Sequence, residues 1–268
     1  MTTEQNCPIC SSDRQHYFTQ RILNKYDVDY FYCNHCGFLQ TEQPHWLDEA
    51  YGNAIADADT GLVSRNINIA GKLSNVLLFL FGKDGRYLDT AGGYGMLTRL
   101  MRDIGFDFYW SDPYCENILS KGFELATTEP PFTAITAFEV LEHVYDPLEF
   151  ISSSLDRAQT STLIFSTELF SGSPPAFSDW YYYLPGTGQH ISFYQLRTLQ
   201  FIADKLSLKL YSSGSFHILT NKKVSAQLIN TLVAGRLSRL IGSCVKLVMR
   251  SRSKMMIDHH KMLNTAVH

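Results

Sequence analysis

Long apolar runs are missing from this sequence of 268 residues. The longest, residues 76–81, is far shorter than the roughly 20 residues that a transmembrane helix needs. The first residues also lack the basic stretch and apolar core of a secretory signal peptide. These absences argue against a membrane-spanning helix and lead us to expect a cytoplasmic protein. Internal repeats and low-complexity segments are missing too, so we expect one large globular domain with a small appendage.

Acidic residues are scarce at one end of the chain. Residues 221–268 carry nine Lys and Arg against one acid, Asp258, although the whole chain has a net charge of −3. Such a basic tail can contact nucleic acid or a membrane surface, or it can be the solvated face of a terminal helix. Apolar side chains recur at helical spacing through residues 224–249, which predicts an amphipathic helix. We expect this helix to pack on the domain or on a partner chain, with peripheral membrane contact as the alternative.

Cysteines are few, but most of them stand at metal-ligand spacing. Four of the six form two C-x2-C pairs, which are Cys7 with Cys10 and Cys33 with Cys36. Four thiolates in two close pairs can form the tetrahedral shell of a structural Zn²⁺, and Gly37 suits the tight knuckle after the second pair. Short strands expected at residues 17–18 and 30–32 complete the pattern of a zinc ribbon.

A glycine-rich turn links an expected strand to an expected helix. Residues 86–90 form a short apolar strand, and apolar side chains at helical spacing fill residues 96–104. Between them lie Gly92, Gly93 and Gly95. A strand, a tight turn and a helix N-terminus together form a binding site for a nucleotide cofactor. A nicotinamide fingerprint needs a third small residue where Thr98 stands, so the turn fits a different cofactor.

Two acids favour a cofactor with an amino-acid end and a ribose. Asp89 lies inside the turn, where a carboxylate would repel phosphate but could order an α-amino group, directly or through water. Asp112 follows the next expected strand, residues 107–111, where an acid can accept hydrogen bonds from both ribose hydroxyls.

With these features the sequence resembles the class I S-adenosylmethionine-dependent methyltransferases. Residues 132–147 are similar to the family's fourth strand and the segment after it, through the run Phe-Glu-Val-Leu-Glu-His at residues 138–143. Two positions depart from the family pattern: Thr133 stands where an Asp is usual, and Ala91 stands where the first glycine is usual. Alanine keeps the turn only if its φ is negative, so we expect a slightly different loop.

The resemblance implies a Rossmann-like α/β fold with a seven-stranded, mostly parallel sheet that an antiparallel hairpin closes. The strands are expected at residues 86–90, 107–111, 122–126, 133–138 and 161–166, and the hairpin at 208–213 and 215–220. The resemblance also implies which residues bind S-adenosylmethionine. These are Asp89, Ala91, Gly92, Gly93, Gly95, Asp112, Pro113, Tyr114, Phe138 and Glu139.

Four segments are expected along the chain. They are a zinc ribbon at 1–41, a helical linker or lid at 42–82, a methyltransferase domain at 83–221 and a basic helical extension at 222–268. The linker is dense in functional groups that could cover the cofactor, or it could be a solvated pair of helices. The groups in question are Tyr51, Asp59, Thr60, Gly61 and Arg65.

Methyl transfer from a sulfonium requires an aligned acceptor and, for a weakly acidic acceptor, a base. Glu139 ends the fourth strand and is expected near the sulfonium. His190, with Gln189 beside it to orient the acceptor, follows the fifth strand in a loop rich in glycine and aromatic residues. It is either the general base or a core histidine. His143 is a second catalytic candidate, and Glu142 is more typical of a helix cap.

Three functions stay open on the sequence. The first is methyl transfer to O or C of a small molecule such as a nucleotide sugar or glycan precursor. It rests on residues 189–194, which resemble a bacterial subfamily often found with polysaccharide genes and, more loosely, zinc-ribbon sugar C-methyltransferases. The aromatic residues 180–183 could stack a sugar or seal the core.

The second function is RNA methylation by a protein that grips RNA with its ribbon and tail. Residues 1–40 carry three basic residues against four acidic ones, which disfavours nucleic acid at the ribbon. The third is a non-catalytic binding protein on the same fold, which the departures at Ala91 and Thr133 would allow. The sequence does not decide the oligomeric state.

Overall fold

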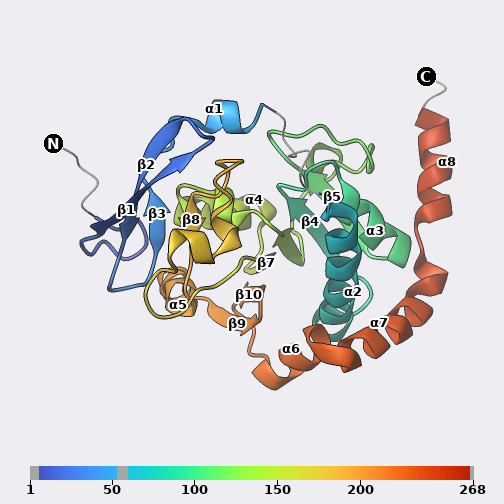
Figure 1. The fold of residues 1–268 in the computed structure, drawn as a ribbon. Coiled ribbons are helices and arrows are strands. Elements are labelled where there is room, and N and C mark those ends of the chain that lie inside the picture. Colours follow the sequence, from blue (N-terminus) through green and yellow to red (C-terminus); the bar gives the residue numbers. More distant parts are fainter. Residues whose placement is uncertain (1–5, 53–59, 266–268) are drawn as a thin grey trace. The chain divides into compact units, whose positions relative to one another are not determined.

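The chain forms two compact units, each assembled from segments that lie far apart in the sequence (Figure 1). The computed structural model describes residues 6–52 and 60–265. Unit 1 comprises Met1–Asp57, Phe138–Ser153 and Phe165–Lys223, and unit 2 comprises Ala58–Ala137, Ser154–Ile164 and Val224–His268. The segment boundaries expected after residues 41, 82 and 221 stay predictions.

Unit 1 contains a four-stranded antiparallel sheet of order β1-β2-β3-β8. Its strands are β1 (Gln15–Ile22), β2 (Tyr26–Tyr32), β3 (Leu39–Thr41) and β8 (Ser192–Phe193). Alternate side chains of β2 are buried, namely Val28, Tyr30 and Tyr32, because successive residues of a strand point to opposite faces. These side chains pack with Trp46 and Phe193 in one aromatic core. The sequence predicted parts of β1 and β2 but not the pairing of the ribbon with β8.

Unit 2 contains the parallel strands that lead to the glycine turn. Strand β4 (Arg86–Thr90) pairs in parallel with β5 (Asp107–Ser111) and with β6 (Ala134–Ala137). The strand expected at residues 122–126 is wrong. Glu124 forms only an isolated bridge with Trp110, and a 3₁₀ turn, η1 (Leu125–Thr127), follows it. The Glu124 carboxylate accepts hydrogen bonds from Asn117 and from the Gly122 backbone, so local bonding replaces the strand here.

The α/β fold class with a mostly parallel sheet is confirmed. The six-stranded sheet has the order β5-β4-β6-β7-β10-β9, with β7 at Thr162–Ser166, β9 at Lys209–Ser213 and β10 at Phe216–Thr220. Strands β9 and β10 form the expected antiparallel hairpin around Gly214, whose φ of +60° suits the tight turn. Six strands instead of the seven expected follow from the loss of the strand at 122–126.

The remaining helices are mostly short. Unit 1 holds α1 (Leu47–Ala50) and α5 (Leu196–Lys205), and α4 (Pro147–Ala158) follows the run at 138–143. In unit 2, the long helix α2 (Leu62–Phe81) and α3 (Met96–Ile104) flank β4 in the sequence. The helix expected at 224–249 is broken into α6 (Ala226–Val233) and α7 (Gly235–Met249), because Gly235 adopts a φ of +70°.

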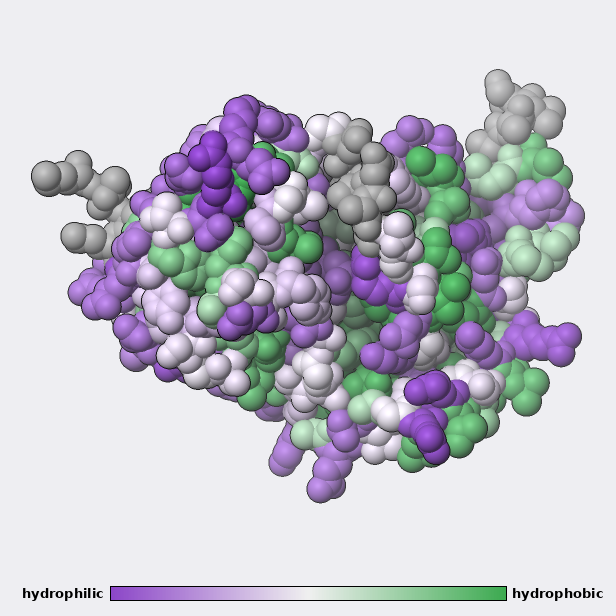
Figure 2. Space-filling model, viewed as in Figure 1, coloured by the Kyte–Doolittle hydropathy of each residue, from purple (hydrophilic) through white to green (hydrophobic). Residues whose placement is uncertain are grey.

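The C-terminal helices pack within unit 2. Helix α7 lies along α2 (Figure 1), and the Asn75 amide of α2 donates hydrogen bonds to the backbone carbonyls of Leu232 and Ser238. One face of α7 therefore packs within unit 2, on a helix that the sequence analysis placed in the linker at 42–82. The other face exposes Leu240 and Leu247 among basic residues, and Figure 2 shows this mixture of green and purple over the helix.

Helix α8 (Met255–Thr265) carries the acid that stood alone in the basic tail. Asp258 is 3% exposed and forms a bidentate ion pair with Arg102 of α3. The Arg102 nitrogens donate to the two Asp258 carboxylate oxygens at 2.7 and 2.8 Å. Arg99 approaches the same carboxylate to 2.9 Å. Among the described residues, no helix combines the length and apolarity needed to cross a bilayer.

Candidate active site and metal centre

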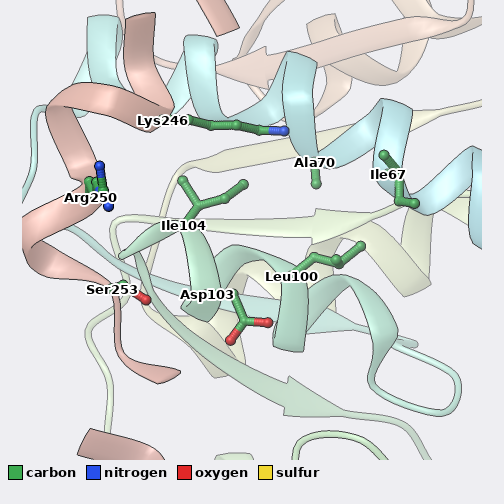
Figure 3. A pocket seen from close by; sticks show the side chains of 8 residues that line it. All are labelled: Ile67, Ala70, Leu100, Asp103, Ile104, Lys246, Arg250 and Ser253. Carbon is green, nitrogen blue, oxygen red and sulfur yellow. The ribbon is translucent and has the colours of Figure 1, made fainter. Parts of the chain in front are cut away.

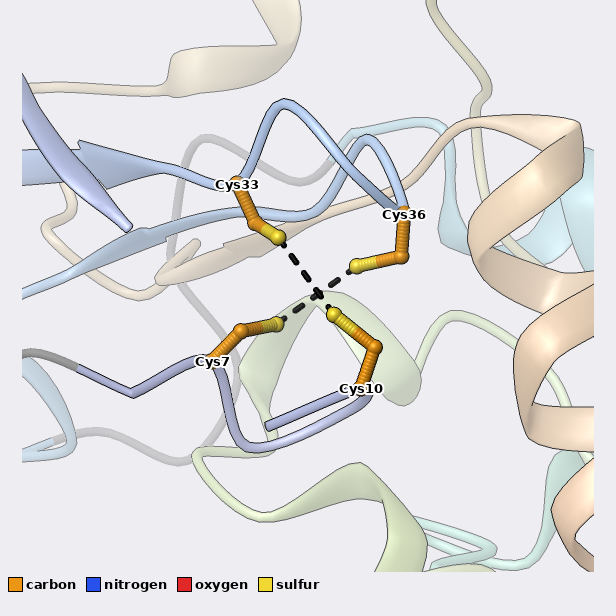
Figure 4. A group of neighbouring side chains, drawn as sticks. All are labelled: Cys7, Cys10, Cys33 and Cys36. Atoms are coloured by element: carbon orange, nitrogen blue, oxygen red, sulfur yellow. Dashed lines mark hydrogen bonds between the residues drawn. The ribbon is translucent and has the colours of Figure 1, made fainter. Parts of the chain in front are cut away.

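The four paired cysteines converge on one point in unit 1. Cys7 and Cys10 precede β1, and Cys33 and Cys36 follow β2. The Cys7 and Cys36 sulfurs lie 3.5 Å apart, and the Cys10 and Cys33 sulfurs lie 3.4 Å apart. Figure 4 shows the four sulfurs directed at a common centre. A tetrahedral zinc shell with Zn–S distances of 2.3 Å places sulfurs about 3.8 Å apart, so the cluster fits Zn²⁺ with little movement.

Two matching turns hold the cysteine pairs. Ser11 donates its N–H to the Cys7 carbonyl, and Gly37 donates its N–H to the Cys33 carbonyl, each at 2.8 Å. Both turn residues are left-handed, with φ of +64° and +79°. A Cβ on Gly37 would also collide with the Gln195 side chain, so glycine is required there. A hydrogen bond from the Cys36 thiol lowers the pKa of Cys7 to about 5.

The glycine turn of unit 2 opens α3 with three left-handed residues. These are Ala91, Gly93 and Gly95, with φ of +58°, +54° and +85°. The expectation of a negative φ at Ala91 is therefore wrong: the alanine adopts the backbone that a glycine would adopt, against the clash of its own Cβ. Side chains enclose Gly92, where an added Cβ would lie 2.7 Å from the Trp110 ring. Space is open at Gly93, where an added Cβ meets nothing within 4 Å.

Asp112, at the end of β5, forms a hydrogen bond with the backbone of the glycine turn. One carboxylate oxygen accepts the Gly93 N–H at 2.9 Å, and the other accepts the N–H groups of Tyr114 and Cys115 at 2.8 and 2.9 Å. Each carboxylate oxygen can accept more than one hydrogen bond, so the carboxylate stays available to a ribose. Pro113 and Tyr114 beside it are exposed to solvent. Asp112 thus lies at the end of β5, as expected, and its role in binding a ribose stays a prediction.

Asp89 is buried beneath the turn rather than open at its surface. Its carboxylate is 3% exposed and accepts hydrogen bonds from the hydroxyls of Thr136, at 2.6 Å, and Thr98, at 3.5 Å. Burial raises the pKa of Asp89 to about 7, and the charge of Asp112 adds to the shift. A cation bound at the turn would favour the ionised form of this carboxyl group.

The loop after β5 contributes two residues that the sequence analysis missed. A Cβ on Gly95 would collide with the side chains of Asn117 and Ser120, so this loop packs directly on the turn. The N–H groups of Ile118 and Leu119 also bond to the Tyr94 carbonyl, at 3.2 and 3.0 Å. Asn117 and Ser120, two polar residues three apart that follow β5, were the signal in the sequence that could have indicated this contact.

The run at 138–143 departs from the expected secondary structure. Strand β6 ends at Ala137, and Glu139 then adopts a left-handed φ of +55°. Its carboxylate accepts a hydrogen bond from the Ser166 hydroxyl at 2.6 Å, and Ser166 also accepts the Glu139 N–H. Phe138 is half-buried and packs against the Phe216 ring. A non-glycine residue held at positive φ is typical of functional sites.

Glu142 and His143 form a 3₁₀ turn, η2 (Leu141–His143), and not the start of the next helix, which begins at Pro147. The cap role expected for Glu142 is therefore wrong. Its side chain is fully buried, and its carbonyl accepts the Ile191 N–H at 2.8 Å. This bond joins η2 to the segment that carries His190.

The two candidate histidines lie against each other. The ring centroids of His143 and His190 are 4.8 Å apart and the rings are nearly perpendicular. The Nδ1 atom of His190 bonds to the Tyr182 carbonyl at 2.7 Å, and Nδ1 of His143 lies 3.1 Å from the Gln189 carbonyl and 2.9 Å from the Tyr51 hydroxyl. Burial lowers the pKa of His190 to about 4 and that of His143 to about 3, so both are neutral at pH 7.

The segments around this pair divide into core and surface. Tyr182 and Tyr183 are buried in the aromatic core, whereas Tyr181 is 73% exposed. The Gln189 side-chain amide donates a hydrogen bond to the Ala50 carbonyl at the end of α1, at 2.8 Å. The role expected for Gln189 in orienting the acceptor stays a prediction. Of the expected lid groups, Tyr51 reaches the histidines, and Asp59 lies outside the described residues.

Comparison with known proteins decides the family. The profile described as "Methyltransferase domain" matches residues 65–213, more than half of the chain. The chain belongs to this methyltransferase family. It is an S-adenosylmethionine-dependent methyltransferase, and the sequence-based identification of the enzyme class is confirmed. A search of curated proteins finds no match.

Solved structures of methyltransferases resemble the chain at low identity. Magnesium protoporphyrin IX methyltransferase (ChlM) from Synechocystis PCC 6803 with bound S-adenosylhomocysteine is 16% identical, with a TM-score of 0.44, over 65% of this chain and 90% of that one. Mitomycin 7-O-methyltransferase MmcR is 15% identical, with a TM-score of 0.47, over 65% of this chain and 59% of that one.

The glycine turn of this methyltransferase fits its cofactor. Gly93 leaves open space above the backbone, and the Asp112 carboxylate lies at the end of the adjoining strand. A separate cavity of about 350 Å³ lies among α2, α3 and α7 (Figure 3). Its lining includes Leu100, Lys246 and Arg250 but none of the predicted cofactor residues. The cavity is therefore separate from the cofactor residues that the sequence predicts.

Proposed function

We propose that this methyltransferase methylates O or C of a small, hydroxyl-rich acceptor, such as the sugar of a nucleotide sugar or glycan precursor. The observation that carries the acceptor class is a cluster of acids beside an exposed tyrosine in unit 1. Burial and then the charge of Glu139 raise the pKa of Glu168. Partial burial, followed by the charges of Glu168 and Glu139, raises the pKa of Tyr181. Carboxylates accept hydrogen bonds from sugar hydroxyls, and the exposed Tyr181 ring can stack on a sugar face.

The cofactor role of the predicted residues belongs to the same proposal. S-adenosylmethionine supplies an electrophilic methyl group on a sulfonium. In unit 2, the Asp112 carboxylate would bind the ribose hydroxyls, Asp89 would favour the α-amino group, and the open backbone at Gly93 would let the cofactor approach. The other members of the predicted set are Ala91, Gly92, Gly95, Pro113, Tyr114, Phe138 and Glu139.

In unit 1, His190 and His143 are the groups that we propose act on the acidic proton of the acceptor. Both are neutral at pH 7, so each retains a nitrogen lone pair. Their low pKa values make them weak proton acceptors by themselves, because a general base works best when its pKa lies near the working pH.

A structural zinc ion in the cysteine cluster is the third part of the proposal. The four sulfurs offer a closed shell with no open position for a substrate, which is the pattern of structural zinc. Total metal analysis of purified protein should give one zinc per chain at this site, and Cys33→Ser should lose it. Full zinc retention in Cys33→Ser would contradict the assignment.

The ribbon's charges support a small molecule over RNA. Arg14 bonds to the Gln40 side chain, Arg21 lies 3.8 Å from an Asp27 oxygen, and Lys25 pairs with Glu49 at 2.6 Å. Cations already engaged with acids or amides are poorly placed to neutralise phosphates.

The test is a substrate screen with a binding control. Purified protein, S-adenosylmethionine and a panel of nucleotide sugars and sugar phosphates are incubated, and mass spectrometry detects an acceptor that gains one methylene mass. A methylated sugar with wild type, and at least a tenfold lower rate with Asp112→Ala below cofactor saturation, is the expected result. Methylation of RNA but of no sugar in parallel reactions would overturn the acceptor class.

A further inference from the structure

Three ligand-forming side chains meet in the interior of unit 1, away from the four cysteines. Glu142, His143 and His190 each bring one potential ligand atom to within 4.8 Å of the others. They come from two segments that are far apart in the sequence, which the bond from the Ile191 N–H to the Glu142 carbonyl holds together. The Tyr194 hydroxyl adds a 2.7 Å hydrogen bond to the Leu141 carbonyl and anchors η2 a second time.

The hydrogen bonds of the two histidines fix which nitrogen carries the lone pair. A carbonyl oxygen only accepts, so the bonds to Tyr182 and Gln189 require N–H at Nδ1 of His190 and His143. The Tyr51 hydroxyl, which can donate or accept, then accepts from Nδ1 of His143 as well. The Nε2 atoms therefore hold the lone pairs. Metal-binding histidines characteristically donate one ring N–H to a backbone carbonyl in this way, which fixes the tautomer and orients the ring.

Another buried histidine of unit 1, His217, has both ring nitrogens hydrogen-bonded, as expected of a structural histidine. His217 is fully buried, and both of its nitrogens are engaged, Nδ1 with the Ser212 hydroxyl at 2.9 Å and Nε2 with the Thr167 carbonyl at 3.0 Å. Among the described residues, His143 and His190 form their hydrogen bonds through Nδ1 only.

We propose that Glu142, His143 and His190 bind a divalent transition-metal cation, at a site distinct from the cysteine cluster. Two imidazoles and one carboxylate suit a first-row cation such as Zn²⁺, Fe²⁺ or Mn²⁺ better than Mg²⁺ or Ca²⁺, which prefer oxygen ligands throughout. Ligand atoms around an ion with bonds of about 2.1 Å lie at most about 4.2 Å apart, so the three groups need to close by only a fraction of an ångström.

Such a cation would let the two histidines act on the acceptor as metal ligands, because a lone pair bound to the metal cannot itself take up a proton. This step rests on the proposed function. Three protein ligands leave positions open, and a hydroxyl oxygen of the acceptor bound there would lose its proton to water near neutral pH. That oxygen then forms a bond to the methyl carbon while the carbon–sulfur bond breaks, and the sulfur keeps the electron pair as S-adenosylhomocysteine.

Binding of Mn²⁺ to the full chain loaded with one equivalent of zinc tests the site, because the four thiolates hold that zinc and leave the nitrogen and oxygen ligands to Mn²⁺. Electron paramagnetic resonance follows the free Mn²⁺ signal during titration. One Mn²⁺ per chain is expected for wild type, with spin-echo modulation from imidazole nitrogen. The modulation is measured on the wild-type protein, so it tests the ligands without any mutation. Its absence from bound Mn²⁺ would refute the ligand assignment.

The matched variants separate ligation from folding. Asn can replace the Nδ1–H donor of a histidine but offers nothing at the Nε2 position, so His190→Asn and His143→Asn should keep the carbonyl bonds and weaken Mn²⁺ binding at least tenfold. Glu142→Gln should also weaken Mn²⁺ binding at least tenfold. His16→Ala, an exposed histidine of the same unit, should bind Mn²⁺ as wild type does.

Failure of the cation site and failure of the proposed function give different results. Calorimetric titration with S-adenosylhomocysteine on the same samples reports the cofactor site alone. Cofactor binding without stoichiometric Mn²⁺ binding would overturn the cation inference and leave the methyltransferase proposal standing. Mn²⁺ binding that both Asn variants retain would overturn the assignment to these histidines.

Discussion

Among single residues, Ala91 stands out because it occupies a left-handed position that glycine adopts without strain. Its φ is +58°, and an L-residue at such a position costs about 1–2 kcal/mol, against 0.5–1 kcal/mol of extra chain entropy that a glycine would lose on folding. Ala91→Gly should therefore raise the unfolding free energy by up to about 1 kcal/mol. Urea denaturation measures the change.

The control for Ala91 is an alanine with ordinary backbone angles. Ala176 is exposed and has a φ of −58°, so Ala176→Gly should lower the unfolding free energy by about 0.5–1 kcal/mol. If both variants were destabilised equally, the positive φ at Ala91 would not be a source of strain in solution.

Asp89 gives the second prediction for a single residue. Because burial raises its pKa to about 7, about half of these carboxyl groups are protonated at pH 7 in the free protein. The stability that the neutral form provides is complete below the unfolded pKa of about 3.9 and is lost as the pH rises through 7. A bound α-ammonium group favours the carboxylate, so cofactor binding at pH 7 should release up to about half a proton.

Calorimetry of S-adenosylhomocysteine binding in two buffers of different ionisation enthalpy measures that proton. Asp89→Asn should bind with no proton release from this position. Equal proton release by wild type and Asp89→Asn would place the titrating group elsewhere.

Among the elements, α8 depends on one buried ion pair. Asp258 and Arg102 are both nearly buried, and removing one charge of such a pair leaves the other without compensation, at about 3–5 kcal/mol. Asp258→Asn should therefore destabilise unit 2 by several kcal/mol. Asp103→Asn is the matched control, since Asp103 pairs with Arg99 at a more exposed site and should change stability by about 1 kcal/mol or less.

The same pair predicts how α8 responds to acid. Burial opposes ionisation of Asp258, but hydrogen bonds and charges from Arg102 and Arg99 outweigh it and lower the pKa below the usual value. The stability from this depressed pKa is present above the unfolded value of about 3.9 and is lost as the pH falls through the folded value. Amide exchange of α8 should accelerate below about pH 4 in wild type, and Asp258→Asn should lose this dependence.

Elements that the sequence predicted well have strong local patterns. Strand β4, helix α3 and strand β5 lie where apolar spacing placed them, because each buries a continuous apolar face. Strands β3 and β8 were missed because three and two residues carry no periodic signal, and their pairing joins Leu39 to Phe193. The strand expected at 122–126 failed because side-chain bonds to Glu124 compete with a ladder.

Candidate site residues, like the strands and helices, could be predicted where the signal is local in the sequence and were missed where it depends on tertiary contacts. The convergence of the four cysteines and the position of Asp112 beside the glycine turn could be predicted, because both follow from local spacing in the sequence. The Glu142–His143–His190 cluster was not predicted, because a 3₁₀ turn replaced the expected helix start and moved Glu142 into the interior. Only the tertiary pairing brings η2 to residues 189–191.

For the molecule as a whole, the cysteine cluster and the histidine pair are parts of one packed unit. The Thr41 N–H bonds to the Ile191 carbonyl at 3.0 Å, and the Cys36 carbonyl accepts the Thr198 hydroxyl at 2.8 Å. Loss of zinc should therefore loosen the segment that carries His190. Chelation should speed amide exchange at Thr41 and Ile191 at least tenfold, equivalent to about 1.4 kcal/mol.

The amides of β4 in unit 2 are the internal reference for that measurement. Their exchange should be unchanged when zinc is removed. Uniform acceleration in both units would indicate general unfolding and contradict a local role for the metal.

The pairing of β3 with β8 also sets an order for the growing chain on the ribosome. The four cysteines are all synthesised by residue 36, so a metal can close the knuckles early. The free edge of β3 then stays open until Ser192 and Phe193 emerge, and such an edge can pair with another nascent chain. The sheet of unit 1 is thus completed late, more than 150 residues after the last of the four cysteines has been synthesised.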